Sequence, residues 1–137
     1  MPMSSTHQVR RFYEVLWDAH DKSAIPSVLH ESFTFRGSLG QEKKGHDGFA
    51  QYVDGVHEAL GDYRCIIQQL VSEDNKVFAK MLFTGIHKGD FMGFSPTGKR
   101  VEWHGCALFT FTGPLISDVW VLGDLKNLEL KLERNAI

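Results

Sequence analysis

The sequence predicts an α+β fold in which helices pack on one face of a curved, mostly antiparallel sheet. Two observations predict this class. Apolar residues recur at helical spacing up to residue 61, and after residue 62 β-branched and aromatic runs alternate with short turns. Helices that precede an antiparallel meander pack together on one of its faces. The other face of the sheet must then meet a second subunit or close around something.

Two helices are expected before the meander, each with a single apolar face. Ser4, Ser5 or Thr6 can cap the first helix, and Gly61 ends the second. Asp47 lies in the first turn of the second helix, where negative charge suits the helix dipole. The apolar residues of the first helix are Val9, Phe12, Tyr13, Leu16 and Trp17, and those of the second are Phe49, Tyr52, Val53, Val56, Ala59 and Leu60.

The remaining elements are shorter or belong to the sheet. Pro26 indicates a break after the first helix, followed by a short helical turn through Val28 and Leu29. Residues 41–45 are polar and are expected to form a loop. The tail from 125 to 134 is amphipathic and fits either a helix or a further strand. Strands are expected at 33–35, 63–71, 77–87, 101–112 and 115–122.

Composition fits one domain over residues 1–137 and excludes several classes of function. The chain is 42% hydrophobic and 23% charged, with a net charge of −2 and scattered basic residues, which argues against a nucleic-acid binder. No apolar run approaches the roughly 20 residues of a membrane span. Residues 1–7 have neither a basic flank nor an apolar stretch, so no signal peptide is expected. We therefore expect a cytoplasmic protein that does not contact a membrane.

Familiar reactive motifs are missing from the sequence. Cys65 and Cys106 lie far apart in apolar surroundings, which is typical of buried thiols rather than a redox pair. The seven histidines show neither His-x-His nor His-Glu-x-x-His spacing, so no metal site is expected. Residues 93–98 do not form the Gly-x-Ser-x-Gly turn of a hydrolase, and no phosphate loop or dinucleotide fingerprint is present.

The most distinctive stretch runs from Thr84 to Lys99. It reads TGIHKGDFMGFSPTGK, and further on Ile116, Trp120 and Asp124 follow at intervals of four. Together these motifs resemble the SnoaL-like polyketide cyclase family, a branch of the nuclear transport factor 2-like superfamily. The sequence departs from the family pattern at two places. The family has threonine at the position of Ile86, and it usually has Asp-Gly-Lys where residues 113–115 are Gly-Pro-Leu here. The resemblance implies a cone-shaped fold whose mouth holds a small apolar molecule.

The resemblance also implies a chemistry and a candidate catalytic pair. Cyclases of this family close a ring by aldol chemistry without cofactor or metal, using an acidic residue with a histidine nearby. The acidic residue carries over to Asp124 through its spacing from Trp120, and His104 is the nearest candidate histidine. If residues 113–115 form a three-residue turn, His104 faces Asp124 in the hairpin. If the turn has two residues, His104 faces Gly123 and Asp124 lies on the other side of the sheet.

Several further residues are candidates for binding a substrate. His87 ends the second long strand, where it either lines the mouth of the pocket or hydrogen-bonds the following loop and holds its shape. Aromatic and methionine side chains can wall a ligand, although such residues at helical spacing also build cores. The candidates for the wall are Tyr13, Trp17, Tyr52, Phe91, Met92 and Trp120.

Two functions follow from these observations. The first is a cofactor-independent enzyme of cyclase or isomerase type, in which Asp124 is the general acid/base toward a small apolar carbonyl compound and His104 is its partner. The alternative is a non-catalytic module of the same fold that binds a small molecule and dimerises. In both cases the open face of the sheet predicts a homodimer.

Overall fold

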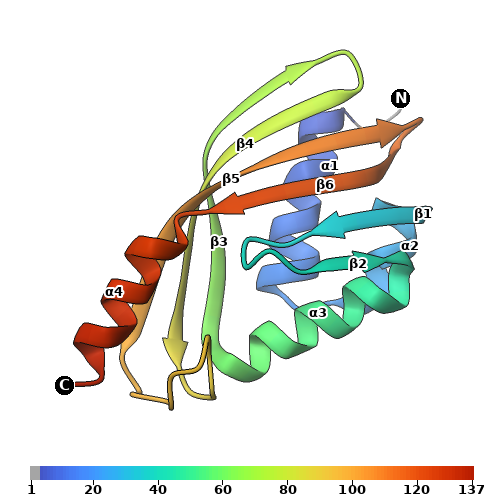
Figure 1. Ribbon diagram of the computed structural model, residues 1–137. Coiled ribbons are helices and arrows are strands. Elements are labelled where there is room, and N and C mark those ends of the chain that lie inside the picture. Colours follow the sequence, from blue (N-terminus) through green and yellow to red (C-terminus); the bar gives the residue numbers. More distant parts are fainter. Residues whose placement is uncertain (1–3) are drawn as a thin grey trace.

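The computed structural model of the chain describes residues 4–137 and shows a curved sheet wrapped around helices (Figure 1). This arrangement confirms the predicted α+β class and the curved sheet. The expectation of a missing signal peptide rests partly on residues 1–3, which lie outside the described residues. The strands are β1 (Leu29–Arg36), β2 (Glu42–Lys44), β3 (Leu60–Glu73), β4 (Lys76–His87), β5 (Arg100–Thr112) and β6 (Leu115–Gly123).

The first helix begins as an α-helix and widens into a π-helix. In α1 (Ser5–Arg11) the Ser4 hydroxyl accepts a hydrogen bond from the His7 N–H at 3.2 Å, as an N-cap does. The π-helical segment η1 (Phe12–Asp18) follows without a break. Its wider turn presents Phe12, Tyr13, Leu16 and Trp17 toward the sheet, and all four side chains are buried. Single turns of this kind are often found at functional sites.

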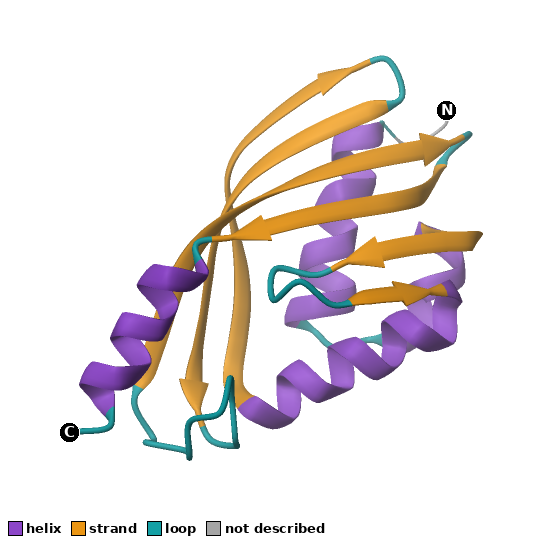
Figure 2. Ribbon diagram, in the orientation of Figure 1, coloured by secondary structure: helices purple, strands orange, loops and turns teal. Residues whose placement is uncertain are grey.

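Three further helical segments and one terminal helix complete the fold. A short 3₁₀ turn η2 (Lys22–Ala24) leads into α2 (Ile25–Val28), which has proline in its first turn. The long helix α3 (Gly45–Ala59) buries the predicted apolar face. The tail forms α4 (Leu125–Asn135), which packs against β5 and buries Leu128 and Leu132. Figure 2 shows α1, η1 and α3 within the concave side of the sheet.

The sheet is ordered β2-β1-β6-β5-β4-β3, and all neighbours are antiparallel except β1 and β6, which are parallel. Two expectations were wrong here. The brief strand expected at 33–35 extends to eight residues in β1, and the loop expected at 41–45 contains the three-residue edge strand β2. Charged residues are typical of edge strands, which explains why Glu42, Lys43 and Lys44 give a sequence pattern typical of a loop.

The β5–β6 hairpin combines both of the registers considered above. Beside the turn, Thr112 pairs with Leu115, so the turn has two residues. A β-bulge at Ser117 then shifts the pairing, and Thr110 pairs with Asp118. The shifted register continues to the Gly105–Gly123 pair, and beyond it the Asp124 N–H donates to the His104 carbonyl at 2.9 Å. The expected opposition of positions 104 and 124 is therefore present, although the bulge produces it rather than a three-residue turn.

The inner face of the sheet, which we define as the face packed on α1, η1 and α3, carries the core. Its residues alternate along each strand with outward-facing ones, as in Trp103, Ala107 and Phe109 of β5. Aromatic rings dominate this layer, and Phe12 lies within 5.3 Å of both Phe49 and Phe109 between ring centroids. The outer face of the sheet leaves apolar side chains exposed, namely Ile66, Val71, Phe78, Leu108, Trp120 and Leu122.

Candidate functional site

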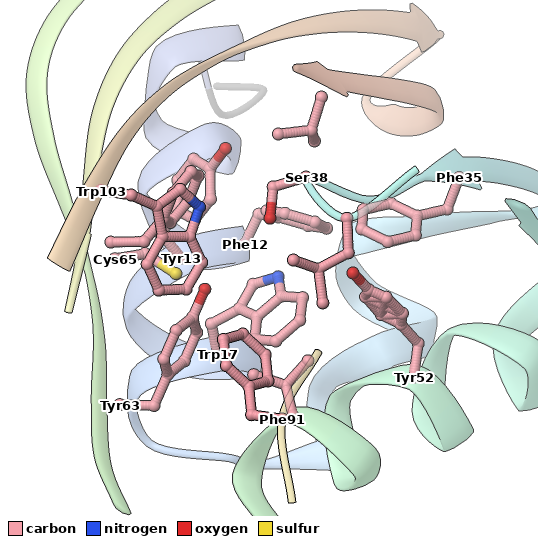
Figure 3. Close-up of a pocket in the computed structure, with 14 residues that line it drawn as sticks. Phe12, Tyr13, Trp17, Phe35, Ser38, Tyr52, Tyr63, Cys65, Phe91 and Trp103 are labelled. Carbon is pink, nitrogen blue, oxygen red and sulfur yellow. The ribbon is translucent and has the colours of Figure 1, made fainter. Parts of the chain in front are cut away.

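A pocket opens between the helices and the inner face of the sheet, and we call it the aromatic pocket (Figure 3). The volume within it that the centre of a water molecule can occupy is about 20 Å³. Rings close on it from several sides, so the space is a narrow slot. It is lined by Phe12, Tyr13, Trp17, Phe35, Ser38, Leu39, Tyr52, Val56, Tyr63, Cys65, Phe83, Phe91, Trp103 and Val121.

Local structure explains why these side chains converge. The π-helical turn brings Tyr13 and Trp17 onto one side of η1, facing the sheet. Strand alternation sends Tyr63 and Cys65 of β3 inward while the residue between them is exposed. The same alternation in β5 places Trp103 inside, opposite Phe83 of β4, with ring centroids 5.5 Å apart. Two features of the backbone therefore set the pocket wall. Every second residue of a strand faces the pocket, and the wider turn of the π-helix turns its aromatic residues toward the sheet.

Burial keeps the titratable groups of the pocket in their neutral forms. It raises the pKa of Tyr52 to about 12, an effect partly offset by the hydrogen bond from the Leu39 backbone. It also raises the pKa of Tyr13 and Tyr63 well above the ordinary tyrosine value. The pKa of the Cys65 thiol rises as well, first from burial and then from the nearby Asp18 charge, so this thiol is a poor nucleophile.

Among the residues that the structure describes, the pocket lining includes no carboxylate, imidazole, ammonium or guanidinium group. Two titratable groups lie just behind it. Asp18 accepts a hydrogen bond from the Cys65 N–H at 2.8 Å, and burial raises the pKa of this half-buried carboxyl. His57 donates through Nε2 to the Trp17 carbonyl at 2.7 Å and stacks on His20 with ring centroids 4.0 Å apart. Both groups therefore hydrogen-bond the backbone of residues that line the pocket, from outside the pocket.

His87 is buried and holds the glycine-rich loop after β4. Its Nε2 lies 3.2 Å from the Phe94 carbonyl, and its Nδ1 lies 3.4 Å from the Thr97 hydroxyl. Because a carbonyl only accepts, Nε2 donates and Nδ1 accepts from Thr97 in a neutral ring. Its backbone also pairs with the loop, at Gly98 and Lys99. His87 does not line the pocket, which favours the loop-holding role among the two considered, and the loop it fixes delivers Phe91 to the pocket.

The structure brings only some of the other candidate wall residues to the pocket. Tyr13, Trp17, Tyr52 and Phe91 line it, and their contact with a substrate stays a prediction. Met92 instead lines a neighbouring groove between α3 and the loop. Trp120 is 43% exposed on the outer face, where the Arg36 guanidinium lies 5.4 Å from its ring centroid. Position 120 is outward because Val119 and Val121 on either side face the core.

The pair Asp124 and His104 is adjacent in the sheet but not sheltered. Both side chains are exposed, and neither lines the aromatic pocket. Asp124 is the N-cap of α4, and its carboxylate accepts a hydrogen bond from the Asn127 N–H at 3.3 Å. The two side chains do not share a sheltered pocket, because the strand alternation that buries Trp103 turns His104 outward. The catalytic role of the pair stays a prediction.

Several lining residues escaped the sequence reasoning. Tyr63, Cys65 and Trp103 occupy alternate strand positions, and a strict count of that alternation would have assigned them to the inner face. Ser38 and Leu39 lie in the turn between β1 and β2, which follows the buried Gly37. An ideal Cβ on Gly37 would lie 2.3 Å from the Tyr52 hydroxyl, so glycine is required for this turn to approach the pocket. Nothing in the pattern of a polar turn signals that role.

The fold and the pocket together define a class of protein: a curved sheet that closes with helices around a narrow apolar pocket. The sequence identifies the family within that class. The SnoaL-like polyketide cyclase family matches residues 7–132, and the chain belongs to this family. The resemblance inferred from residues 84–99 and 116–124 is thereby confirmed.

Solved structures agree with this assignment at the level of the fold. A proposed polyketide cyclase from Acidithiobacillus ferrooxidans is 23% identical with a TM-score of 0.81, covering 99% of this chain and 100% of that one. A SnoaL-like polyketide cyclase from Agrobacterium tumefaciens is 19% identical with a TM-score of 0.78, covering 95% and 99%. AclR, a proposed hydroxylase from Streptomyces galilaeus, is 24% identical with a TM-score of 0.73, covering 87% and 74%.

Three further findings bear on the class of function. Among proteins with a curated description, none matches the chain significantly in sequence. Within residues 4–137, no helix has both the length and the apolar character needed to cross a membrane. Over the same range, no three side chains of the types His, Cys, Asp or Glu gather closely enough to hold a metal ion.

Proposed function

We propose that the chain is a SnoaL-like enzyme of cyclase or isomerase type that acts by proton transfer on a small, neutral, apolar carbonyl compound. One observation supports this function above the others. The chain belongs to this family, and it has a narrow pocket walled by aromatic rings at the inner face of its sheet. Rings of this kind bind a planar apolar molecule and exclude water, which strengthens every hydrogen bond made inside.

The acid–base group of this proposal is Asp124, with His104 as its partner. Their chain neighbours Trp103 and Gly123 lie at the pocket, while strand alternation turns the His104 ring itself to the outer face. In the structure the Asp124 carboxylate caps α4 instead of facing the pocket. Its participation therefore requires the start of α4 to move so that the carboxylate reaches the mouth. A substitution of Asp124 is therefore the most direct test of the proposal.

The test is hydrogen–deuterium exchange at the methyl group of acetophenone, a small aromatic ketone, in deuterated buffer. Abstraction of a proton beside the carbonyl is the first step of aldol chemistry, and NMR measures it without knowledge of the natural substrate. We expect the protein to accelerate exchange above the buffer rate, and Asp124→Asn to abolish the acceleration. Because asparagine caps helices as well as aspartate, this variant folds normally. Retained exchange in the variant would remove Asp124 from the mechanism.

A second candidate function is a binding module without catalysis. The observation in its favour is the uncharged lining: among the described residues, no general acid or base with an ordinary working range faces the pocket. The same assay separates the two functions. Saturable binding of acetophenone with no acceleration of exchange would identify a binding module, and acceleration would identify an enzyme.

We further propose that the outer face of the sheet pairs with a second copy of the chain. The exposed side chains of Phe78, Leu108 and Trp120 lie on paired positions of three neighbouring strands, so they form one continuous apolar row. Val71 of β3, which pairs with Phe78, continues the row, and Leu122 lies two residues further along β6. Apolar patches of this kind on a sheet are typical of subunit interfaces. Sedimentation at micromolar concentration tests the proposal, and a monomer alone would contradict it.

A further inference from the structure

Two hydrogen-bond donors are buried in the aromatic pocket without a partner. They are the hydroxyl of Tyr13 and the indole Nε1–H of Trp103, and within residues 4–137 neither has a hydrogen-bonding atom in reach. The side chains are 2% and 1% exposed. More than nine in ten buried polar groups in proteins are hydrogen-bonded, since an unmade bond leaves the desolvation of the donor uncompensated. Two orphan donors in one pocket therefore call for an acceptor from outside the chain.

The two donors come from different elements and, in the view of Figure 3, lie toward the same end of the pocket. Tyr13 belongs to η1 and Trp103 to β5, and both line the pocket. Figure 3 shows the Trp103 nitrogen and the Tyr13 hydroxyl at the end of the pocket where Ser38 lies. An ideal Cβ on Gly123 would lie 3.3 Å from Trp103 Nε1 and 3.1 Å from the Ser38 Cβ. Glycine at this position keeps a side chain away from the donor end.

The chemistry of these groups selects the kind of acceptor. An indole N–H only donates, and burial keeps the Tyr13 hydroxyl protonated, so both present a proton to the pocket. The described lining contains no cation, so a carboxylate bound here would lose its hydration with nothing to neutralise it. A hydrocarbon would leave both donors unpaired. An uncharged oxygen acceptor on an aromatic or alicyclic ring satisfies all of these conditions.

We propose that the Tyr13 hydroxyl and the Trp103 indole N–H bind the carbonyl oxygen of a neutral ketone or aldehyde ligand. This inference rests on the proposed function and adds the orientation of the ligand, with its oxygen at the Ser38 end of the pocket and its ring between Trp17 and Phe91. The two donors select the substrate class, because they accept neutral carbonyl compounds and reject acids. They also stabilise the negative charge that develops on that oxygen when a neighbouring proton is removed.

The experiment compares three probes of similar shape: acetophenone, cumene, which replaces the carbonyl by a branched carbon, and benzoate, which carries a charge. Tyr13→Phe and Trp103→Phe each remove one donor and keep an aromatic ring. We expect each variant to weaken acetophenone about fivefold, the loss of one hydrogen bond to a buried donor, and to leave the Kd of cumene unchanged. We expect benzoate to bind the wild-type protein at least tenfold more weakly than acetophenone.

Two readouts are independent of affinity. In the wild-type protein the indole proton of Trp103 shifts downfield in the NMR spectrum with acetophenone and not with cumene. The melting temperature of ligand-free Tyr13→Phe equals or exceeds that of the wild type, because the substitution removes an unpaired buried hydroxyl. Trp120→Phe is the matched control for Trp103→Phe, since it removes an indole from the outer face, and it leaves all three affinities unchanged.

The outcomes separate this inference from the proposed function. If Tyr13→Phe and Trp103→Phe weaken acetophenone and cumene alike, or weaken neither, an ordered water satisfies the donors and the inference is overturned, while the pocket remains a binding site. If Trp103→Phe fails to fold, the Tyr13→Phe comparison decides alone. If neither acetophenone nor cumene binds the wild-type protein, both the inference and the proposed function are overturned.

Discussion

Trp103 and Trp120 lie on the same β5–β6 hairpin but on opposite faces of the sheet. Trp103 in β5 is 1% exposed and faces the aromatic pocket, whereas Trp120 in β6 is 43% exposed and lies under an arginine on the outer face. Of the two, only Trp120 was expected in the pocket wall, and only Trp103 lines it. The difference teaches that strand parity, and not side-chain chemistry, decides which residues of this sheet belong to the pocket and which belong to a surface.

The largest expected effect comes from truncating each tryptophan in turn. Trp103→Ala removes a fully buried ring and is expected to lower the free energy of unfolding by about 3–5 kcal/mol. Trp120→Ala loses partial burial and one exposed cation–π contact, for about 1 kcal/mol or less. Urea denaturation of both variants measures the contrast. Equal losses would contradict the assignment of the two rings to different faces.

The next effect concerns the outer face as an interface. Trp120→Glu puts a charge at the β6 end of the apolar row, and we expect it to weaken dimerisation by at least about tenfold, or roughly 1.4 kcal/mol. Sedimentation equilibrium measures the dissociation constant. Lys126→Glu on α4 is the control, because it introduces the same residue at an exposed position away from the row. A control that dissociates equally would show that added negative charge, rather than the row, is responsible.

A smaller effect separates the structural role of Asp124 from its catalytic one. Asp124→Ala removes the N-cap of α4 and is expected to cost about 1 kcal/mol, whereas Asp124→Asn keeps the cap and costs a few tenths at most. Thermal denaturation of the two variants measures this. Combined with the exchange assay on Asp124→Asn, it distinguishes a residue that only caps a helix from one that also transfers a proton. An Ala variant as stable as the wild type would contradict the observed cap.

The smallest effect is a pH dependence that originates behind the pocket. Burial lowers the pKa of His57 below its ordinary value of 6.5, and the charges of His20 and Lys88 add to the shift. As the pH falls through 6.5, the unfolded chain takes up a proton at His57 before the folded chain does. Stability therefore declines as the pH falls through this window. The stability difference between pH 7 and 5 measures it.

Two glutamine variants make this pH test specific. His57→Gln keeps a donor for the Trp17 carbonyl and removes the titration, so its pH dependence is expected to be shallower than that of the wild type. His104→Gln removes an exposed imidazole from the outer face and serves as the matched control. If His104→Gln flattens the pH dependence as much as His57→Gln does, the half-buried imidazole of His57 is not its source.

Most of the fold could be predicted from the sequence because its elements have strong periodicity. The apolar spacing from Val9 to Trp17 located the first helix, although it gave no sign of the π-helical turn that widens it. Long runs of alternating residues located β3 to β6 within a few residues. The strand β2 was missed because three charged residues at a sheet edge carry no apolar pattern. Its pairing with β1 depends on tertiary contacts.

The candidate site was less predictable, because the bulge at Ser117 sets the register of the β5–β6 hairpin and the sequence gives no sign of it. The sequence left two registers open, one of which opposes positions 104 and 124, and it could not tell which face these positions share. The family motif identified His87, yet only the structure shows that this ring holds a loop. The donors of Tyr13 and Trp103 attracted no notice in the sequence, because an orphan hydrogen-bond donor exists only once the chain has folded.

The sheet owes its concavity partly to four backbone irregularities, two in the β3–β4 pairing, one in the β1–β6 pairing and one at Ser117 in β6. Each inserts extra length on one strand and so increases local coiling. Adding or deleting a single residue at these points would change the diameter of the hollow while every lining side chain kept its identity. The size of molecule admitted by such a protein can thus evolve through indels in its frame, independently of the chemistry displayed inside.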